Sequence, residues 1–238
     1  MSALPDTTPR LDHLVVLADT LSEGVSWCEA TLGVTPGPGG EHPLFGTHNR
    51  LLSIAAPGFA LAYIEIIAIN KEAVSAHAAS AIGTKRWFDM DDEVLRGAVR
   101  LHGPRLIHWV ARVPDVASAC TALAARGIDR GDVLAASRPT ATGLLEWKIA
   151  VRPDGRRLMD GCLPTLIEWG DVHPAAAMPA SGLALQSLNL RHPQAEELRD
   201  ALGALGLGNV SVYSGESPVL QAVLHTPRGA VTLSSRSD

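Results

Sequence analysis

The chain has 238 residues, a formal net charge of −5 and three cysteines without CxxC spacing. This length can bury a substantial core, and the acidic balance disfavours nucleic acid and anionic membranes as partners. Residues 1–10 lack a secretory h-region and no apolar run reaches the length of a bilayer span, so we expect no membrane partner and a reducing, cytoplasmic location.

The first segment, residues 11–69, has the pattern of a βαβββ unit. Its apolar opening stretch predicts a strand, and Thr20 with Glu23 forms a capping box at the start of a helix. Gly33 suits the left-handed position after that helix. Apolar stretches at 50–54 and 60–68 predict the strands that follow.

Residues 70–104 do not follow this pattern, and their composition predicts a helical insertion with helices over Lys71–Ile82 and Asp91–His102. The second segment, residues 105–169, repeats the first one. An opening strand at 106–113 precedes Asp115, which is a good N-cap, and the last strand is expected at 165–169.

After a linker rich in alanine and proline, residues 183–235 repeat the pattern a third time. A polar residue in each opening strand precedes the glycine after the helix by 19 or 20 positions, in the pairs His13–Gly33, His108–Gly127 and Ser187–Gly206. The sequence therefore predicts an α+β fold of repeated βαβββ modules, in which the first two pair into a cupped sheet beside a third. That pairing could form within the chain or across a homodimer.

Four polar residues stand at matching places in the first two modules. His13 and His108 lie in the opening strands, and Glu65 and Glu168 lie in the closing strands. A single one would be read as pointing to solvent, because the two faces of a strand alternate. An ionised carboxylate among bulky apolar residues is costly unless it is paired or metal-bound. Two imidazoles and two carboxylates at equivalent positions therefore predict a divalent-metal site.

The repeat and three motifs resemble the vicinal-oxygen-chelate superfamily. Gly39–Leu52, Arg86–Phe88 and Leu166–Trp169 are similar to its glyoxalase-like domain family, and the order His, Glu, His, Glu looks like that of bacterial-type glyoxalase I. The resemblance covers most of residues 11–170. It implies paired modules curled around one divalent ion (Zn, Ni, Mn or Fe), whose ligands come from the first and last strand of each module, here His13, Glu65, His108 and Glu168.

A glycine-flanked loop precedes the second predicted strand of the first module. Its polar residues His42, His48 and Asn49 are candidates for contacts with a small-molecule substrate at the mouth of the cup. The alternative is a turn in which Asn49 and its neighbour Thr47 tie down the backbone. Both interpretations stay open at this point.

The resemblance favours a metalloenzyme of the lyase or isomerase type, acting on a small oxygenated or carbonyl compound. The metal would stabilise an enediolate, and Glu168 or Glu65 would act as general base. One alternative is an iron-dependent ring-cleaving dioxygenase that uses His13, His108 and Glu168. Another is a metal-free protein that binds a small molecule or confers resistance to it.

Overall fold

The computed structural model describes residues 8–72, 85–140 and 143–236. The first module consists of one helix and four strands: β1 (Arg10–Leu17), α1 (Leu21–Leu32), β2 (Glu41–His42), β3 (Thr47–Ser53) and β4 (Tyr63–Ile69). The N-cap contact of the predicted capping box is present at the start of α1, where the hydroxyl of Thr20 accepts a hydrogen bond from the backbone N–H of Glu23. Gly33 ends the helix with a φ of 77°, as the sequence predicted.

The insertion contains α3 (Glu93–His102), which matches the second of its two predicted helices. Most of the other predicted helix, Lys71–Ile82, lies outside the described residues. The second module follows with the elements β5 (Arg105–Arg112), α4 (Val116–Ala124), β6 (Asp132–Thr140), β7 (Gly143–Val151) and β8 (Thr165–Trp169), and the short 3₁₀ helix η1 (Met159–Gly161) lies before β8.

A second short 3₁₀ helix, η2 (Pro174–Ala177), interrupts the segment between the second and third modules. The third module has the same element order as the others: β9 (Ala184–His192), α5 (Ala195–Ala204), β10 (Ser211–Ser214), β11 (Val219–Thr226) and β12 (Gly229–Ser234). Its strands form a separate four-stranded sheet in the order β10-β9-β11-β12. The predicted fold class, with two paired modules and a third beside them, is confirmed.

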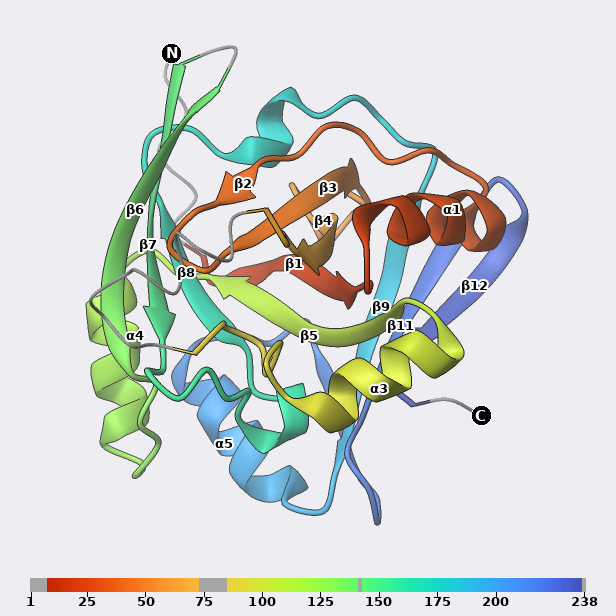
Figure 1. The fold of residues 1–238 in the computed structure, drawn as a ribbon. Coiled ribbons are helices and arrows are strands. Elements are labelled where there is room, and N and C mark those ends of the chain that lie inside the picture. The colour runs from red at the N-terminus through yellow and green to blue at the C-terminus, as the bar shows by residue number, and fades with distance from the viewer. Residues whose placement is uncertain (1–7, 73–84, 141–142, 237–238) are drawn as a thin grey trace.

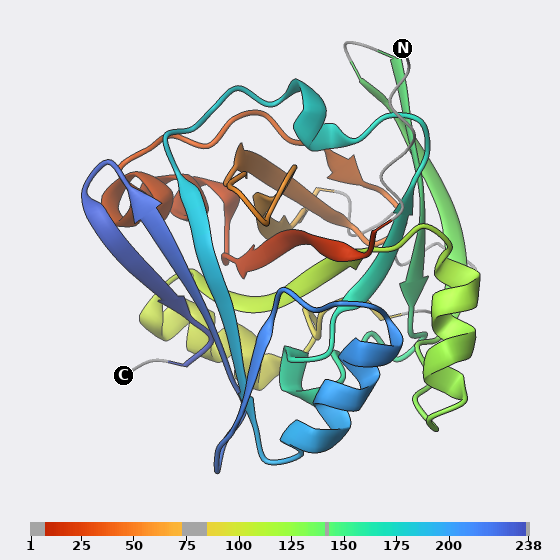
Figure 2. The same cartoon turned by 180° about the vertical axis from the view of Figure 1, so that it is seen from behind.

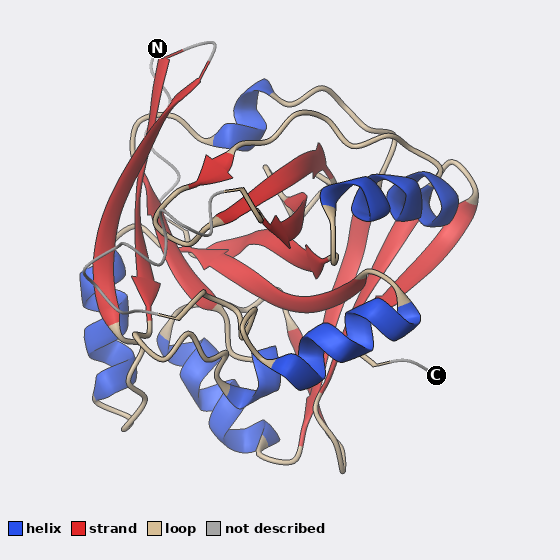
Figure 3. Cartoon of the chain, viewed as in Figure 1, coloured by secondary structure: helices blue, strands red, loops and turns tan. Residues whose placement is uncertain are grey.

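The first two modules share one eight-stranded sheet with the order β2-β3-β4-β1-β5-β8-β7-β6. The antiparallel pair β1–β5 joins them, so the cup is completed within a single chain and does not need a second copy. The sheet curves around a concave face, as the strands in Figure 3 and the ribbon in Figure 1 show. Among the described residues, none of the helices combines the length and apolar character that a bilayer span requires.

The β1–β5 junction carries two bulges that are related by the internal repeat. Asp12 is the extra residue in β1, just before His13, and Ile107 is the extra residue in β5, just before His108. A bulged residue leaves the strict alternation of side chains and can share a face with its neighbour. Both pairs of residues are therefore placed to point toward the concave face.

Two separate hydrophobic clusters lie on the two faces of the large sheet. On β1, Leu14 and Val16 belong to the cluster that includes α1 and the sheet of the third module, whereas Val15 and Leu17 belong to the cluster inside the cup. Figure 2, the view from behind, shows the third module on the side of the large sheet that faces the viewer. The third module therefore closes the convex side of β1 and β5, and the concave side is left for a site.

Candidate functional site

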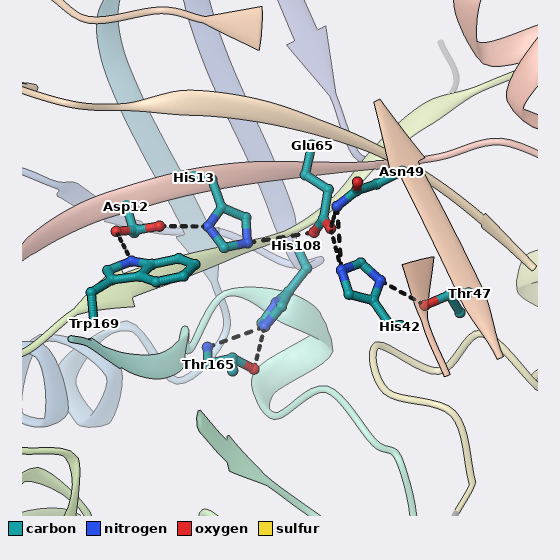
Figure 4. Close-up of polar contacts among 9 residues, drawn as sticks. All are labelled: Asp12, His13, His42, Thr47, Asn49, Glu65, His108, Thr165 and Trp169. Atoms are coloured by element: carbon teal, nitrogen blue, oxygen red, sulfur yellow. Dashed lines mark hydrogen bonds and ion pairs between the residues drawn. The ribbon is translucent and has the colours of Figure 1, made fainter. Parts of the chain in front are cut away.

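Asp12 is a fully buried carboxylate that accepts hydrogen bonds from three side chains. Its donors are His13 Nδ1 at 2.7 Å, Trp169 Nε1 at 2.9 Å and His173 Nε2 at 2.8 Å. The bulge at Asp12 makes the first contact possible, because consecutive residues of a regular strand point to opposite faces. Figure 4 shows Asp12 holding His13 from one side.

Glu65 approaches the same imidazole from the other side. Its Oε2 lies 3.5 Å from His13 Nε2, and its Oε1 accepts a hydrogen bond of 2.6 Å from Asn49 Nδ2. The ring of Tyr63 stacks on His13 with the centroids 4.6 Å apart. The structure thus contains a linear series of groups, Asp12–His13–Glu65, whose orientation is fixed by neighbours on β3 and β4 (Figure 4).

The two carboxylates set the charge of the imidazole between them. Burial by itself lowers the pKa of His13, but hydrogen bonds to Asp12 and Glu65 raise it to about 9. Burial likewise raises the pKa of Glu65, but the hydrogen bond and charge of His13 hold it below its ordinary value. At Asp12, burial also raises the pKa, but the hydrogen bonds from His13 and His173 hold it below its ordinary value. At neutral pH the series is therefore carboxylate, imidazolium, carboxylate.

His42 adds a neutral imidazole to this group. Burial lowers its pKa to about 4 although Glu65 lies 4.0 Å away. Its Nδ1 lies 3.1 Å from the hydroxyl of Thr47, and its Nε2 lies 3.4 Å from Asn49 Nδ2. Of the three loop residues predicted to contact substrate, His42 and Asn49 lie beside Glu65. His48 lies on the other face of β3 and does not line the pocket described next.

His13, His42, Asn49 and Glu65 line one wall of a pocket whose empty volume, including space open to solvent, is about 460 Å³. The opposite walls are aromatic and aliphatic, and consist of Trp87, Phe88, Leu145, Trp147, Ile149, Ile167 and Trp169. A concave, largely apolar pocket with a few convergent polar groups of shifted pKa is typical of a small-molecule site.

His108 occupies the matching position in the second module but is part of the interior. It is fully buried, its Nδ1 lies 3.0 Å from the carbonyl oxygen of Gly161, and its Nε2 accepts a hydrogen bond of 3.2 Å from the backbone N–H of Thr165. Burial and the charges of Arg130 and Arg157 hold its pKa well below the ordinary value. His108 is therefore neutral, and both ring nitrogens already have protein partners.

Glu168 points to the outside of the sheet. One carboxylate oxygen accepts a hydrogen bond from the backbone N–H of Val116 at the start of α4, and the other pairs with the exposed Lys148 at 2.7 Å. The equivalence with Glu65 assumed from sequence is wrong by three residues. In the pairing of β5 with β8, Thr165 lies opposite Val110, as Glu65 lies opposite Val15 in the first module. An odd shift reverses the face of the strand.

The four predicted metal ligands therefore do not form one donor set. His13 and Glu65 contact each other, His108 is satisfied by Gly161 and Thr165, and Glu168 lies on the outside of the sheet. Among the residues that the structure describes, no group of three or more His, Cys, Asp or Glu side chains is arranged to hold a metal ion. The structure does not bring the four predicted ligands together, and the pair that meets, His13 and Glu65, does not by itself make the donor set that the resemblance implied for a divalent ion.

Sequence reasoning missed several residues that line the pocket or hold His13 in place. Asp12 stands directly before His13 in an otherwise apolar strand, and this position could have revealed it. His173 and Arg138 had no comparable signal, because the first lies in a segment interpreted as a linker and the second was assigned to no predicted element. Trp169 was assigned no role, although its indole N–H holds Asp12.

A family model described as a glyoxalase-like domain matches residues 11–206. No curated protein matches the chain. Among solved structures, a hypothetical protein from Staphylococcus aureus is similar over 88% of both chains, with 13% sequence identity and a TM-score of 0.57, and this likeness concerns the fold alone. A methylmalonyl-CoA epimerase from Mycobacterium tuberculosis matches 74% of this chain and 97% of its own, with 17% identity and a TM-score of 0.39.

Proposed function

Because this chain belongs to the glyoxalase-like domain family of the vicinal-oxygen-chelate superfamily, we propose that it catalyses proton transfer at a carbon atom next to a carbonyl group of a small molecule. The reaction would be of the isomerase or lyase type. The observation that carries the proposal is the series Asp12–His13–Glu65 at the wall of the pocket. It holds a proton donor and a proton acceptor side by side in a water-poor environment.

His13 is suited to bind the carbonyl oxygen of the substrate. Its Nδ1–H donates to Asp12, which leaves the Nε2–H facing the pocket beside Glu65. The distance of 3.5 Å between Nε2 and Oε2 is long for a charged hydrogen bond. An incoming carbonyl oxygen can therefore take this proton as its hydrogen-bond partner. An imidazolium kept charged by Asp12 would stabilise the negative charge that develops on that oxygen.

Glu65 is the proposed general base. In the free protein the charge of His13 lowers its pKa, whereas burial raises it. When the substrate oxygen takes over the Nε2–H of His13, the lowering of the Glu65 pKa by His13 weakens, and the raising by burial remains. The basicity of Glu65 then rises at the step at which it removes a proton from carbon. Asn49 holds Oε1, which leaves Oε2 to accept that proton.

The divalent ion and the ring-cleaving dioxygenase chemistry considered from sequence are not part of this proposal. Both relied on His108 and Glu168 meeting His13, and these side chains are committed to other partners. The proposed proton transfer uses only groups that line the pocket.

A second candidate is a small-molecule binding protein without catalytic activity. The observation in its favour is the aromatic wall of the pocket, in which the rings of Trp147 and Trp169 lie 5.8 Å apart. Such a wall can hold a planar or hydrocarbon ligand without chemistry.

Hydrogen exchange in D₂O distinguishes the two candidates. The wild-type protein is incubated with a panel of carbonyl compounds that carry an α-hydrogen, with and without a carboxylate, and the loss of the α-hydrogen signal is followed by NMR. We expect exchange well above the buffer rate for at least one compound, and none of this excess with Glu65→Gln. If compounds that bind to the pocket show no exchange above the buffer rate, the binding protein is the better description.

A further inference from the structure

Arg138 is a cation at the pocket that has no counter-ion in the described structure. It comes from β6 and lines the pocket together with His13 and Glu65. Its Nη1 is buried and makes no hydrogen bond within the described part of the chain. Neither carboxylate of the Asp12–His13–Glu65 series forms an ion pair with it. A cation that lines a pocket and has no ion pair among the described residues favours an anionic ligand.

The backbone beside Arg138 is shaped to admit its side chain. A Cβ atom on Gly40 would lie 1.4 Å from Nη1 of Arg138, so any larger residue at this position would displace the guanidinium. Gly40 is also fixed, because its N–H donates to Oδ1 of Asn49, the residue that holds Glu65. The guanidinium and the proposed base are thus positioned by the same short loop.

Arg138 stands where the pocket meets a larger groove. The groove has an empty volume of about 1150 Å³, and it shares Leu51, Arg138, Leu145 and Pro174 with the pocket. The rest of its wall comes from the segment after α1, from β3 and from the segment around η2, and is mainly apolar: Val34, Pro38, Leu52, Val172, Ala177, Met178 and Pro179.

Among the described residues of the groove wall, Arg138 is the only one of the Asp, Glu, Lys and Arg types. His173 also reaches this wall, but its Nε2–H is engaged by Asp12 and its Nδ1 accepts from the N–H of Ala175. The groove is therefore mainly apolar and carries one charged side chain, at the point where it meets the pocket. A ligand that matches it carries one negative group and a hydrocarbon portion.

We propose that the substrate is an amphipathic carboxylic acid. Its carboxylate pairs with Arg138, its hydrocarbon chain lies in the groove, and its carbonyl end enters the pocket toward His13 and Glu65. The position of the carbonyl end rests on the proposed function, whereas the carboxylate and chain sites do not. Arginine suits this role because its planar fork binds a carboxylate through two parallel hydrogen bonds.

Binding of simple probes tests the proposal without any turnover. Decanoate, decan-1-ol and butanoate, each below its aggregation concentration, are titrated against the protein, and the fluorescence of the pocket residues Trp147 and Trp169 reports binding. The variants are Arg138→Gln, Arg138→Lys and the matched control Arg50→Gln. Arg50 is an exposed arginine on β3 that lines neither cavity. Melting curves establish that each variant is folded.

We expect saturable binding of decanoate that Arg138→Gln weakens on the order of 10-fold and Arg50→Gln leaves unchanged. Arg138→Lys should keep part of the affinity because it keeps the charge. Decan-1-ol should bind more weakly than decanoate to the wild type and equally to Arg138→Gln. Butanoate should bind on the order of 100-fold more weakly than decanoate, because it leaves the groove empty.

The proposal is overturned if decanoate does not bind, if Arg138→Gln and Arg50→Gln bind it equally, or if decan-1-ol binds to the wild type as tightly as decanoate. Its failure can be told apart from that of the proposed function. Arg138-dependent binding with no hydrogen exchange in any compound rejects the catalytic role of Glu65 and leaves the carboxylate site standing. Hydrogen exchange in compounds without a carboxylate, together with no binding of decanoate, rejects the carboxylate site and leaves the catalytic role of Glu65 standing.

Discussion

The first two modules place a histidine at the same point of the same sheet junction and use it in opposite ways. Each histidine follows a bulged residue, which is Asp12 in the first module and Ile107 in the second. Each faces one residue of the last strand of its module, which is Glu65 in the first and Thr165 in the second. Backbone geometry is therefore shared, and the neighbouring side chains differ.

This comparison shows that neighbouring charges, and not position in the fold, determine what a buried histidine does. Burial lowers the pKa of both imidazoles. Two carboxylates reverse that influence at His13 and raise its pKa to about 9. At His108 the positive charges of the nearby Arg130 and Arg157 lower the pKa further. One histidine becomes a charged donor at a cavity, and the other becomes a neutral crosslink within the core.

The largest effect is expected from Glu65→Gln. This change replaces the proposed base with a neutral side chain, so that the residue of the last strand that faces the histidine is uncharged in both modules. The amide can still accept from Asn49, so the fold should be kept, but it cannot take up a proton. Exchange of the substrate α-hydrogen should fall by about 10³-fold. NMR in D₂O measures this rate, and circular dichroism checks the fold. A variant that keeps more than a tenth of the activity would show that another group is the base.

Asp12→Asn makes the surroundings of His13 more like those of His108. Removing one partner of a buried charged pair should destabilise the fold on the order of 3 kcal/mol, as measured by urea unfolding. Activity should also fall, because the pKa of His13 then moves down and less of the imidazolium remains. Unchanged stability and rate together would mean that Asp12 does not control His13.

The pH dependence of stability gives a separate test of the same pair. The folded-state pKa of His13 is raised from 6.5 to about 9. The stability that it contributes is therefore fully present below pH 6.5 and is lost as the pH rises through about 9. Unfolding free energies measured between pH 6 and 10 should decline over this range in the wild type. The decline should be smaller in Asp12→Asn, and equal slopes would contradict the assignment.

Thr165→Val tests the second module. The hydroxyl of Thr165 lies 3.0 Å from His108 Nε2 and accepts a hydrogen bond of 2.9 Å from Arg130. Its loss leaves buried polar groups without a partner and should cost about 1–3 kcal/mol of unfolding free energy. The exchange rate per folded molecule should stay within about twofold of the wild type, since Thr165 does not line the pocket. A selective loss of activity would give His108 a role in the reaction.

The smallest effect is expected from Glu168→Gln. The change removes the ion pair with Lys148 at the surface, and the amide oxygen can still accept from the N–H of Val116. The melting temperature should change less than in Thr165→Val, with no change in exchange rate or in the metal content of the purified protein. A drop in metal content would show that Glu168 is a metal ligand and would contradict the pairing of β5 with β8.

The order of elements and the fold class could be predicted from the sequence because both depend on local chemistry. Apolar stretches and a left-handed glycine such as Gly33 act over a few positions and recur in each module, and a side-chain N-cap such as Thr20 recurs in the first two. The importance of His13, Glu65 and Asn49 was also visible, because polar residues in apolar strands are conspicuous. The repeat predicted that His13 and Glu65 share a site, and the structure brings them together, whereas the contact of Asn49 with Glu65 was not predicted.

Which groups share a site was decided by tertiary structure. Strand register turned Glu168 outward and put Thr165 in its place, and a difference of three residues has no local signature. A bulge brought Asp12 onto the face of His13, and bulges depend on the pairing of two distant strands. His173 contacts Asp12, and Arg138 lines the pocket, both from segments far from His13 in the chain. The pKa values of His13 and His108 shift in opposite directions because tertiary structure places different charges beside them, and charge acts through space.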